Sequence, residues 1–135
     1  MDGSLPKRDG RALARVIAAN AERDAVAVAK MAPDRELADE VVGLHAQQAA
    51  EKYLKAVLAH RGITYRRVHS ITYLLGLLSD HEVAPPPRAP ELEAFTPWAP
   101  QARYDLDTEG AVLDRDAAME LVRGVQEWAH AELGA

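Results

Sequence analysis

The chain has 135 residues, no cysteine and a formal net charge of −5, a length that suits one domain with a buried core. Without cysteine, disulfides, thiol chemistry and cysteine-based zinc sites are excluded. The negative charge argues against a strongly basic, non-specific nucleic-acid binder, although a local basic patch is compatible with it. Abundant alanine and few aromatic residues (5%) favour helix over sheet.

No apolar run approaches the roughly 20 residues that a membrane-spanning helix needs, and the N-terminus is too polar for a signal peptide. A cytoplasmic protein without membrane contact is therefore expected. Residues 1–9 predict a flexible lead-in, because glycine, serine and proline interrupt them. Residues 10–135 predict one helical domain. Its first helix is expected over about residues 11–31, with an apolar face formed by Leu13, Val16, Ile17, Val28 and Met31. Asn20 and Asp24 fall within or beside that face, where they either hydrogen-bond to a neighbouring helix or border a polar groove; half-exposed positions are favoured.

A second helix, over about residues 34–60, is the centre of the pattern, since nothing in residues 44–58 interrupts a helix. Its expected apolar positions are Val41, Leu44, Leu54, Val57 and Leu58. Along it, Gln48, Glu51 and Lys55 form one polar stripe at i, i+3 and i+7, and Glu51 precedes Lys55 in the favourable i, i+4 order. Spacing alone favours a solvated face with an ordinary ion pair.

The loop after this helix gathers positive charge in Arg66, Arg67 and His69. Ser70 is suited to cap a third helix over residues 71–78, whose free N–H groups would lie near the arginine pair. Such an arrangement suits an anion such as phosphate. The alternative is that His69 packs locally and the arginines are ordinary solvated charges.

The rest of the chain predicts shorter elements and one more long helix. Residues 79–90 form a stiff, proline-rich connector, residues 91–104 a short helix and turn interrupted by prolines, and residues 105–110 an acidic loop. A last helix is expected over about residues 114–133, with an inward face of Ala117, Leu121, Val125 and Trp128. The fold class is therefore all-α, an up-and-down bundle of four to five helices.

Three stretches resemble the HEPN family (higher eukaryotes and prokaryotes nucleotide-binding domain). They are residues 45–56, which resemble its signature helix, residues 61–71 with the leucine pair that follows, and residues 102–105, which resemble its "ARYP" element. The resemblance implies a bundle of four or five helices, a homodimer, and a minimal nucleotidyltransferase as partner in a two-component, toxin–antitoxin-like system. In such a domain Gln48, Glu51 and Lys55 look like the lining of a shared groove.

The resemblance also raises the question of catalysis, because many HEPN domains are metal-independent ribonucleases with an arginine and a histidine separated by four to six residues. Here only Arg123 and His130 meet that spacing, near the end of the last helix, so they are weak catalytic candidates. The histidines show no metal-ligand spacing, and neither a metal nor a cofactor is expected.

Three hypotheses follow. The first is a homodimeric module that binds a nucleotide or RNA phosphate through Arg66, Arg67, His69 and Arg103 and docks a nucleotidyltransferase. The second is a ribonuclease toxin. The third is an assembly module in which the polar stripe forms the dimer seam.

Overall fold

The computed structural model describes residues 7–104 and 110–134, with side chains over 10–102 and 110–134, and every regular element in these ranges is a helix. Four α-helices and two 3-10 segments follow one another in these ranges. They are α1 (Lys7–Met31), α2 (Asp39–His60), α3 (Ile71–Asp80), η1 (Ala89–Trp98), η2 (Pro100–Tyr104) and α4 (Arg115–Leu133). The predicted all-α bundle is confirmed. No helix in the described ranges is long and apolar enough to cross a bilayer.

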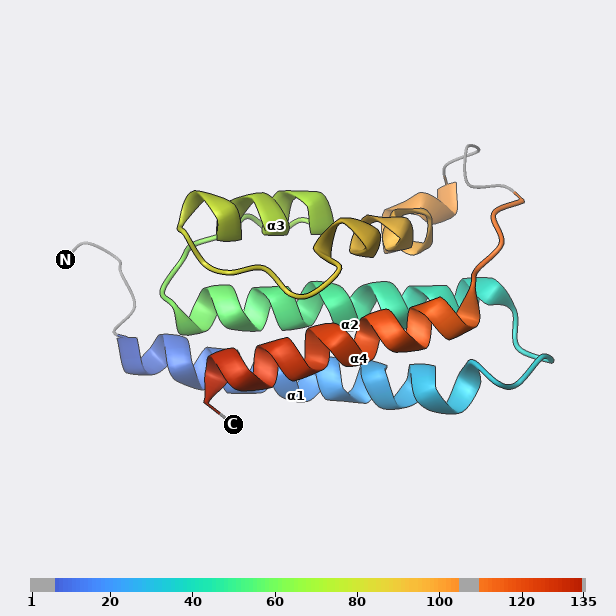
Figure 1. The fold of residues 1–135 in the computed structure, drawn as a ribbon, viewed down its shortest axis with the longest axis horizontal. Helices are drawn as coiled ribbons and strands as arrows, with labels where there is room; N and C mark the ends of the chain where they lie inside the picture. Colours follow the sequence, from blue (N-terminus) through green and yellow to red (C-terminus); the bar gives the residue numbers. More distant parts are fainter. Residues whose placement is uncertain (1–6, 105–109, 135) are drawn as a thin grey trace.

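The helix α2 lies at the centre of the bundle (Figure 1), with α1 and α4 along one side of it and α3 and η1 along the other. Thirteen of its 22 residues are buried, because its small alanines let neighbouring helices approach closely while larger residues fill the gaps between them. The largest side chains of the core come from α2, α3, η1 and α4: Tyr53, Leu54, Leu58, Leu74, Leu78, Leu92, Phe95 and Val125. Each buried leucine contributes about 1.5–3 kcal/mol through the hydrophobic effect.

The first 3-10 segment packs directly on the backbone of α2. A Cβ atom at Gly43 would lie 2.5 Å from the indole ring of Trp98, so only glycine leaves room for this tryptophan. Trp98 is itself buried, at 8% exposure. Leu92 and Phe95 of the same segment reach the core, which explains why a stretch interrupted by prolines is nonetheless ordered. The predicted short helix and turn are thus two 3-10 segments, the first beginning at Ala89.

The start of α4 is fastened to the connection between α1 and α2 by Arg115, which is buried at 8% exposure. Its guanidinium donates to Asp39 (3.0 Å) and to the backbone carbonyls of Ala32 (3.1 Å), Asp34 (2.9 Å) and Leu37 (2.5 Å). The same carboxylate accepts the backbone N–H of Leu113. This N–H bond and the guanidinium keep the pKa of Asp39 below its ordinary value. We call this contact the Arg115 clamp.

Several predicted boundaries and core positions differ from the structure. The first helix begins at Lys7 rather than near residue 11, the central helix begins only at Asp39, and the third helix continues to Asp80. The expected lead-in over 1–9 falls largely outside the described ranges, as does most of the acidic loop. Leu13 and Val16 are 42% and 60% exposed, so the prediction that they form the inner face of α1 is wrong.

The reason is the close approach of α1 to α2. Ala14, Ala21 and Ala25 occupy the inner face together with Val28, because small side chains allow the two helices to touch. At one crossing point a Cβ atom on Gly10 would lie 2.8 Å from the backbone oxygen of Ala59. Large side chains in α1 therefore turn outward. Other expected core residues are also less buried than predicted: Val41 is 39% exposed, and Ile17, Met31, Leu44, Ala117 and Trp128 are half-buried.

Candidate functional site

The polar stripe of α2 is organised around a buried carboxylate, Glu51, which is 2% exposed. It accepts hydrogen bonds from Gln47 Nε2, Lys55 Nζ and His69 Nδ1, each at 3.0 Å. Gln48 extends this network by donating to Gln47 at 2.7 Å. The interpretation of the stripe as a solvated face with an ordinary ion pair is therefore wrong. Glu51 is a buried anion whose charge is balanced by Lys55 and neutralised further whenever His69 is protonated.

The histidine of this network is held in place from three directions. Ser70 caps α3 as predicted, with its Oγ accepting from the backbone N–H of Tyr73 at 3.1 Å. Gln101 of η2 donates to the carbonyl of His69 at 3.2 Å, and Glu51 holds the ring through Nδ1. The His69 side chain is 49% exposed, and within the described ranges Nε2 has no hydrogen-bond partner. An imidazole fixed through one nitrogen and accessible at the other is suited to meet a ligand.

The two arginines of the loop differ in their surroundings. The guanidinium of Arg66 lies over the ring of Tyr73, 4.5 Å from its centroid, and the Arg66 backbone N–H donates to the Tyr73 hydroxyl at 3.1 Å. Hydrogen bonding to Arg66 lowers the pKa of Tyr73. Arg67 is exposed and makes no ion pair with any described residue. Lys55, by contrast, is committed to Glu51 and to the face of Tyr65, 5.7 Å from the centroid.

The structure thus brings together two sets of residues that the sequence analysis treated separately. The His69 ring joins the end of the basic loop to the polar stripe through its contact with Glu51. We name the group of Gln48, Glu51, Lys55, Arg66, Arg67 and His69 the α2–α3 site; hydrogen bonds join its stripe to His69, and Arg66 contacts Tyr73 of α3. Arg103 belongs to η2, which Gln101 ties to His69, but its own side chain lies outside the described residues.

A second polar cluster lies between α1 and α4, at the weak catalytic candidate His130. Its ring nitrogen Nε2 forms a short hydrogen bond with Glu22, and Gln126 donates both to Glu22 (2.8 Å) and to the hydroxyl of Tyr53 (3.0 Å). The His130 ring also meets Tyr53 edge-on. Burial raises the pKa of Glu22, but hydrogen bonds from Tyr53 and His130 outweigh it, leaving that pKa below its ordinary value.

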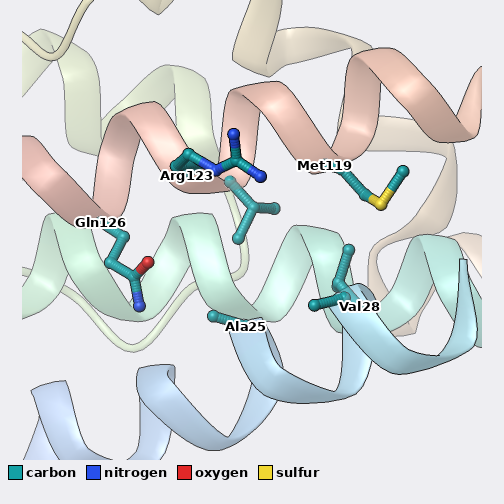
Figure 2. Close-up of a pocket in the computed structure, with 7 residues that line it drawn as sticks. Ala25, Val28, Met119, Arg123 and Gln126 are labelled. Atoms are coloured by element: carbon teal, nitrogen blue, oxygen red, sulfur yellow. The ribbon is translucent and has the colours of Figure 1, made fainter.

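Arg123 lies one helical turn before Gln126, at the rim of a small pocket of about 90 Å³. Figure 2 shows how α1 and α4 both supply its lining, with Ala25 and Val28 from α1 and Met119, Arg123 and Gln126 from α4. Within the described ranges Arg123 makes no ion pair, and no contact joins it to His130.

Glu22 and Tyr53 are participants that the sequence analysis missed. Glu22 is 108 residues from its partner His130, and no local spacing signals a contact over that distance. Asp24 was also misjudged as half exposed. It is buried at 8% exposure, where it pairs with Lys52 at 2.7 Å and with His45 at 2.9 Å. That trio joins α1 to α2 and supports the bundle.

Comparison with known families gives one match over most of the chain: the model described as "HEPN domain" fits residues 17–132. The matched segment covers most of α1 and α4 and everything between them, including the α2–α3 site and the cluster around His130. Comparisons with curated proteins and with solved structures gave no match.

Proposed function

The chain belongs to the HEPN domain family, and from this premise we propose that it binds the phosphate group of a nucleotide or of RNA at the α2–α3 site. The observation that carries the proposal is the pairing of His69 with the buried Glu51. The Glu51 carboxylate accepts from Nδ1 and so fixes the orientation of the imidazole ring. This leaves Nε2 as the exposed ring nitrogen, and an N–H at that position would donate to a phosphate oxygen.

The charges around His69 support an anion as ligand. Lys55 offsets the charge of Glu51 within the network, so the positive charges left to face a ligand are those of Arg66 and Arg67, which precede His69 in the sequence. The chain as a whole has a net charge of −5, so these positive groups form a local basic site on a protein that is acidic overall. Arg103, on the neighbouring η2, is proposed as a further phosphate contact.

The wider setting of the proposal follows from the family. We include in it a single domain over residues 10–135, a homodimer located in the cytoplasm, and a minimal nucleotidyltransferase as partner in a toxin–antitoxin-like pair. Glu51 accepts from Gln47, Lys55 and His69 of its own chain, and the assembly module with this stripe as dimer seam stays the third hypothesis.

The phosphate proposal predicts that reversing both arginine charges, Arg66→Glu with Arg67→Glu, abolishes binding. Two favourable phosphate contacts become repulsive ones, and affinity for a fluorescein-labelled RNA oligomer is expected to fall at least about a hundredfold at 100 mM salt. Fluorescence anisotropy measures the affinity, and circular dichroism checks that helicity is unchanged.

The matched control is Arg23→Glu with Lys30→Glu, which changes the net charge equally on the exposed side of α1. Wild-type affinity in this control and loss in the loop variant support the proposal. Equal losses in both variants indicate a general charge effect, and retained affinity in the loop variant contradicts the phosphate site.

A second candidate function, metal-independent RNA cleavage, is favoured by one observation, the fixed Glu22–His130 pair. A carboxylate that orients a half-exposed histidine prepares it to take a proton from an RNA 2′-hydroxyl, which then attacks the adjacent phosphorus and expels the 5′-oxygen. Arg123 lies seven positions before His130, two helical turns along α4, and would stabilise the charge that develops on the phosphate.

We expect the wild-type protein to leave a labelled transfer-RNA pool intact over hours at micromolar concentration, because Arg123 is not held toward His130 by any described contact. Gel electrophoresis of the pool provides the measurement, with His130→Ala and His81→Ala run in parallel. Cleavage that is lost in His130→Ala and kept in His81→Ala would establish the ribonuclease and displace the binding module as the primary function.

A further inference from the structure

Arg66 is the one arginine of the α2–α3 site whose guanidinium lies over an aromatic ring among the described residues. Three other arginines, Arg61, Arg88 and Arg115, each pair with a carboxylate in the described parts of the chain. Arg66 instead places its guanidinium 4.5 Å from the centroid of Tyr73 and has no carboxylate partner there. Its side chain is exposed and its guanidinium carbon lies over the ring, so the side of the group away from the ring meets solvent.

This stack is held in place by the backbone on both sides. The Tyr73 hydroxyl accepts the Arg66 backbone N–H at 3.1 Å. This hydrogen bond holds the loop against the same ring that the Arg66 side chain covers. Tyr73 belongs to the first turn of α3, where the Ser70 cap fixes its backbone N–H. These bonds position the ring against the loop, and the contact with the ring positions the guanidinium, whose solvent side offers a flat surface to a ligand.

We propose that the α2–α3 site takes single-stranded RNA, with an unpaired base stacked on the open face of the Arg66 guanidinium. The inference rests on the proposed phosphate-binding function and adds the class of nucleic acid to it. Unpaired bases stack on arginine planes and aromatic rings, and this contact tolerates any base because each has a π face. The neighbouring Arg67 and His69 then meet the phosphates on either side of the stacked nucleotide.

The stacking surface also selects against duplex RNA. In a duplex both faces of each base are already stacked, and side chains cannot enter the narrow major groove. An RNA strand with splayed bases is the form that offers both a free base face and a phosphate to neighbouring arginines of one loop, Arg66 and Arg67.

The test uses Arg66→Lys, which keeps the positive charge and removes the planar group. Three probes of equal length are compared by anisotropy at one salt concentration: a single-stranded RNA octamer, an abasic ribose-phosphate octamer and the octamer in duplex form. Wild-type protein is expected to bind the single strand about tenfold more tightly than the abasic strand. Arg66→Lys is expected to remove that preference and leave abasic affinity within about twofold. Arg67→Lys, the matched control, is expected to keep the preference.

Failure of this inference and failure of the proposed function give different results. If wild-type protein binds none of the three probes, the phosphate site itself is wrong and the inference falls with it. If it binds the abasic strand as tightly as the RNA strand, the phosphate site stands and the stacking is wrong. A preference that survives in Arg66→Lys also overturns the stacking, and a wild-type preference for duplex overturns the assignment to single strands.

Discussion

Replacing Arg115 with methionine is expected to lower the free energy of unfolding by about 3–5 kcal/mol. The Arg115 side chain is 8% exposed and donates to three carbonyls and to Asp39, so its removal leaves four acceptors without this donor, the one at Ala32 buried and the other three partly buried. Methionine fills a similar volume but offers no hydrogen bond. The loss is a large fraction of the stability of a domain of this size.

Urea denaturation followed by circular dichroism measures this change. Arg115→Lys keeps the charge and loses the forked geometry, so it is expected to lie between wild type and Arg115→Met. Arg23→Met, on the exposed side of α1, is the matched control and is expected to change stability by less than about 0.5 kcal/mol. A loss below about 1 kcal/mol for Arg115→Met would show that the Arg115 clamp contributes little to the fold.

The second large effect is expected at Glu51. Replacing it with leucine is expected to cost about 2–4 kcal/mol, because Lys55 and Gln47 lose the acceptor that satisfies them in the interior. Lys55 is 15% exposed, which places the expected loss below the cost for a fully buried charge. The same change frees His69 from its only side-chain partner and is expected to weaken RNA binding.

A double variant distinguishes the loss of stability caused by the unpaired charge of Lys55 from the loss caused by altered packing. Glu51→Leu with Lys55→Met replaces the ion pair by apolar side chains and is expected to recover at least about half of the stability lost in Glu51→Leu, since no lone charge stays behind. RNA binding is not expected to recover, because His69 remains unheld. Glu40→Leu, at an exposed position of α2, serves as the stability control. No recovery in the double variant would show that packing, rather than the charge of Lys55, accounts for the loss.

The fold could be predicted because its strongest signals are local. The centre of α2 contains no helix breaker, Ser70 stands at the position of a helix cap, and glycine at position 62 has the positive φ expected of a helix stop. The inner face of α1 could not be predicted from hydrophobicity. Leu13 and Val16 have larger apolar side chains than Ala14 and Ala21, yet the alanines are the residues that face α2. The short distance between α1 and α2 leaves room only for small side chains, and no local sequence pattern encodes that distance.

For the candidate site, too, some residues could be predicted from the sequence and the contacts between them could not. Spacing identified Glu51 and Lys55, and charge identified Arg66 and His69, because each signal lies within one helix or loop. Neither signal shows that His69 reaches back 18 residues to Glu51, or that Arg66 lies on the ring of Tyr73. Those contacts depend on how the loop returns over α2, which is a property of the tertiary structure.

The Arg115 clamp also has a consequence for the order in which the domain assembles. Its hydrogen bonds span 76 to 83 residues of chain, whereas α1 and α2 are neighbours joined by a short connection. Contacts between near neighbours close at a smaller cost in chain entropy than contacts across most of the sequence. The hairpin of α1 and α2 therefore forms early and α4 docks late. Weakening the clamp should then act mainly on how fast the finished domain opens, and leave the rate of hairpin formation almost unchanged.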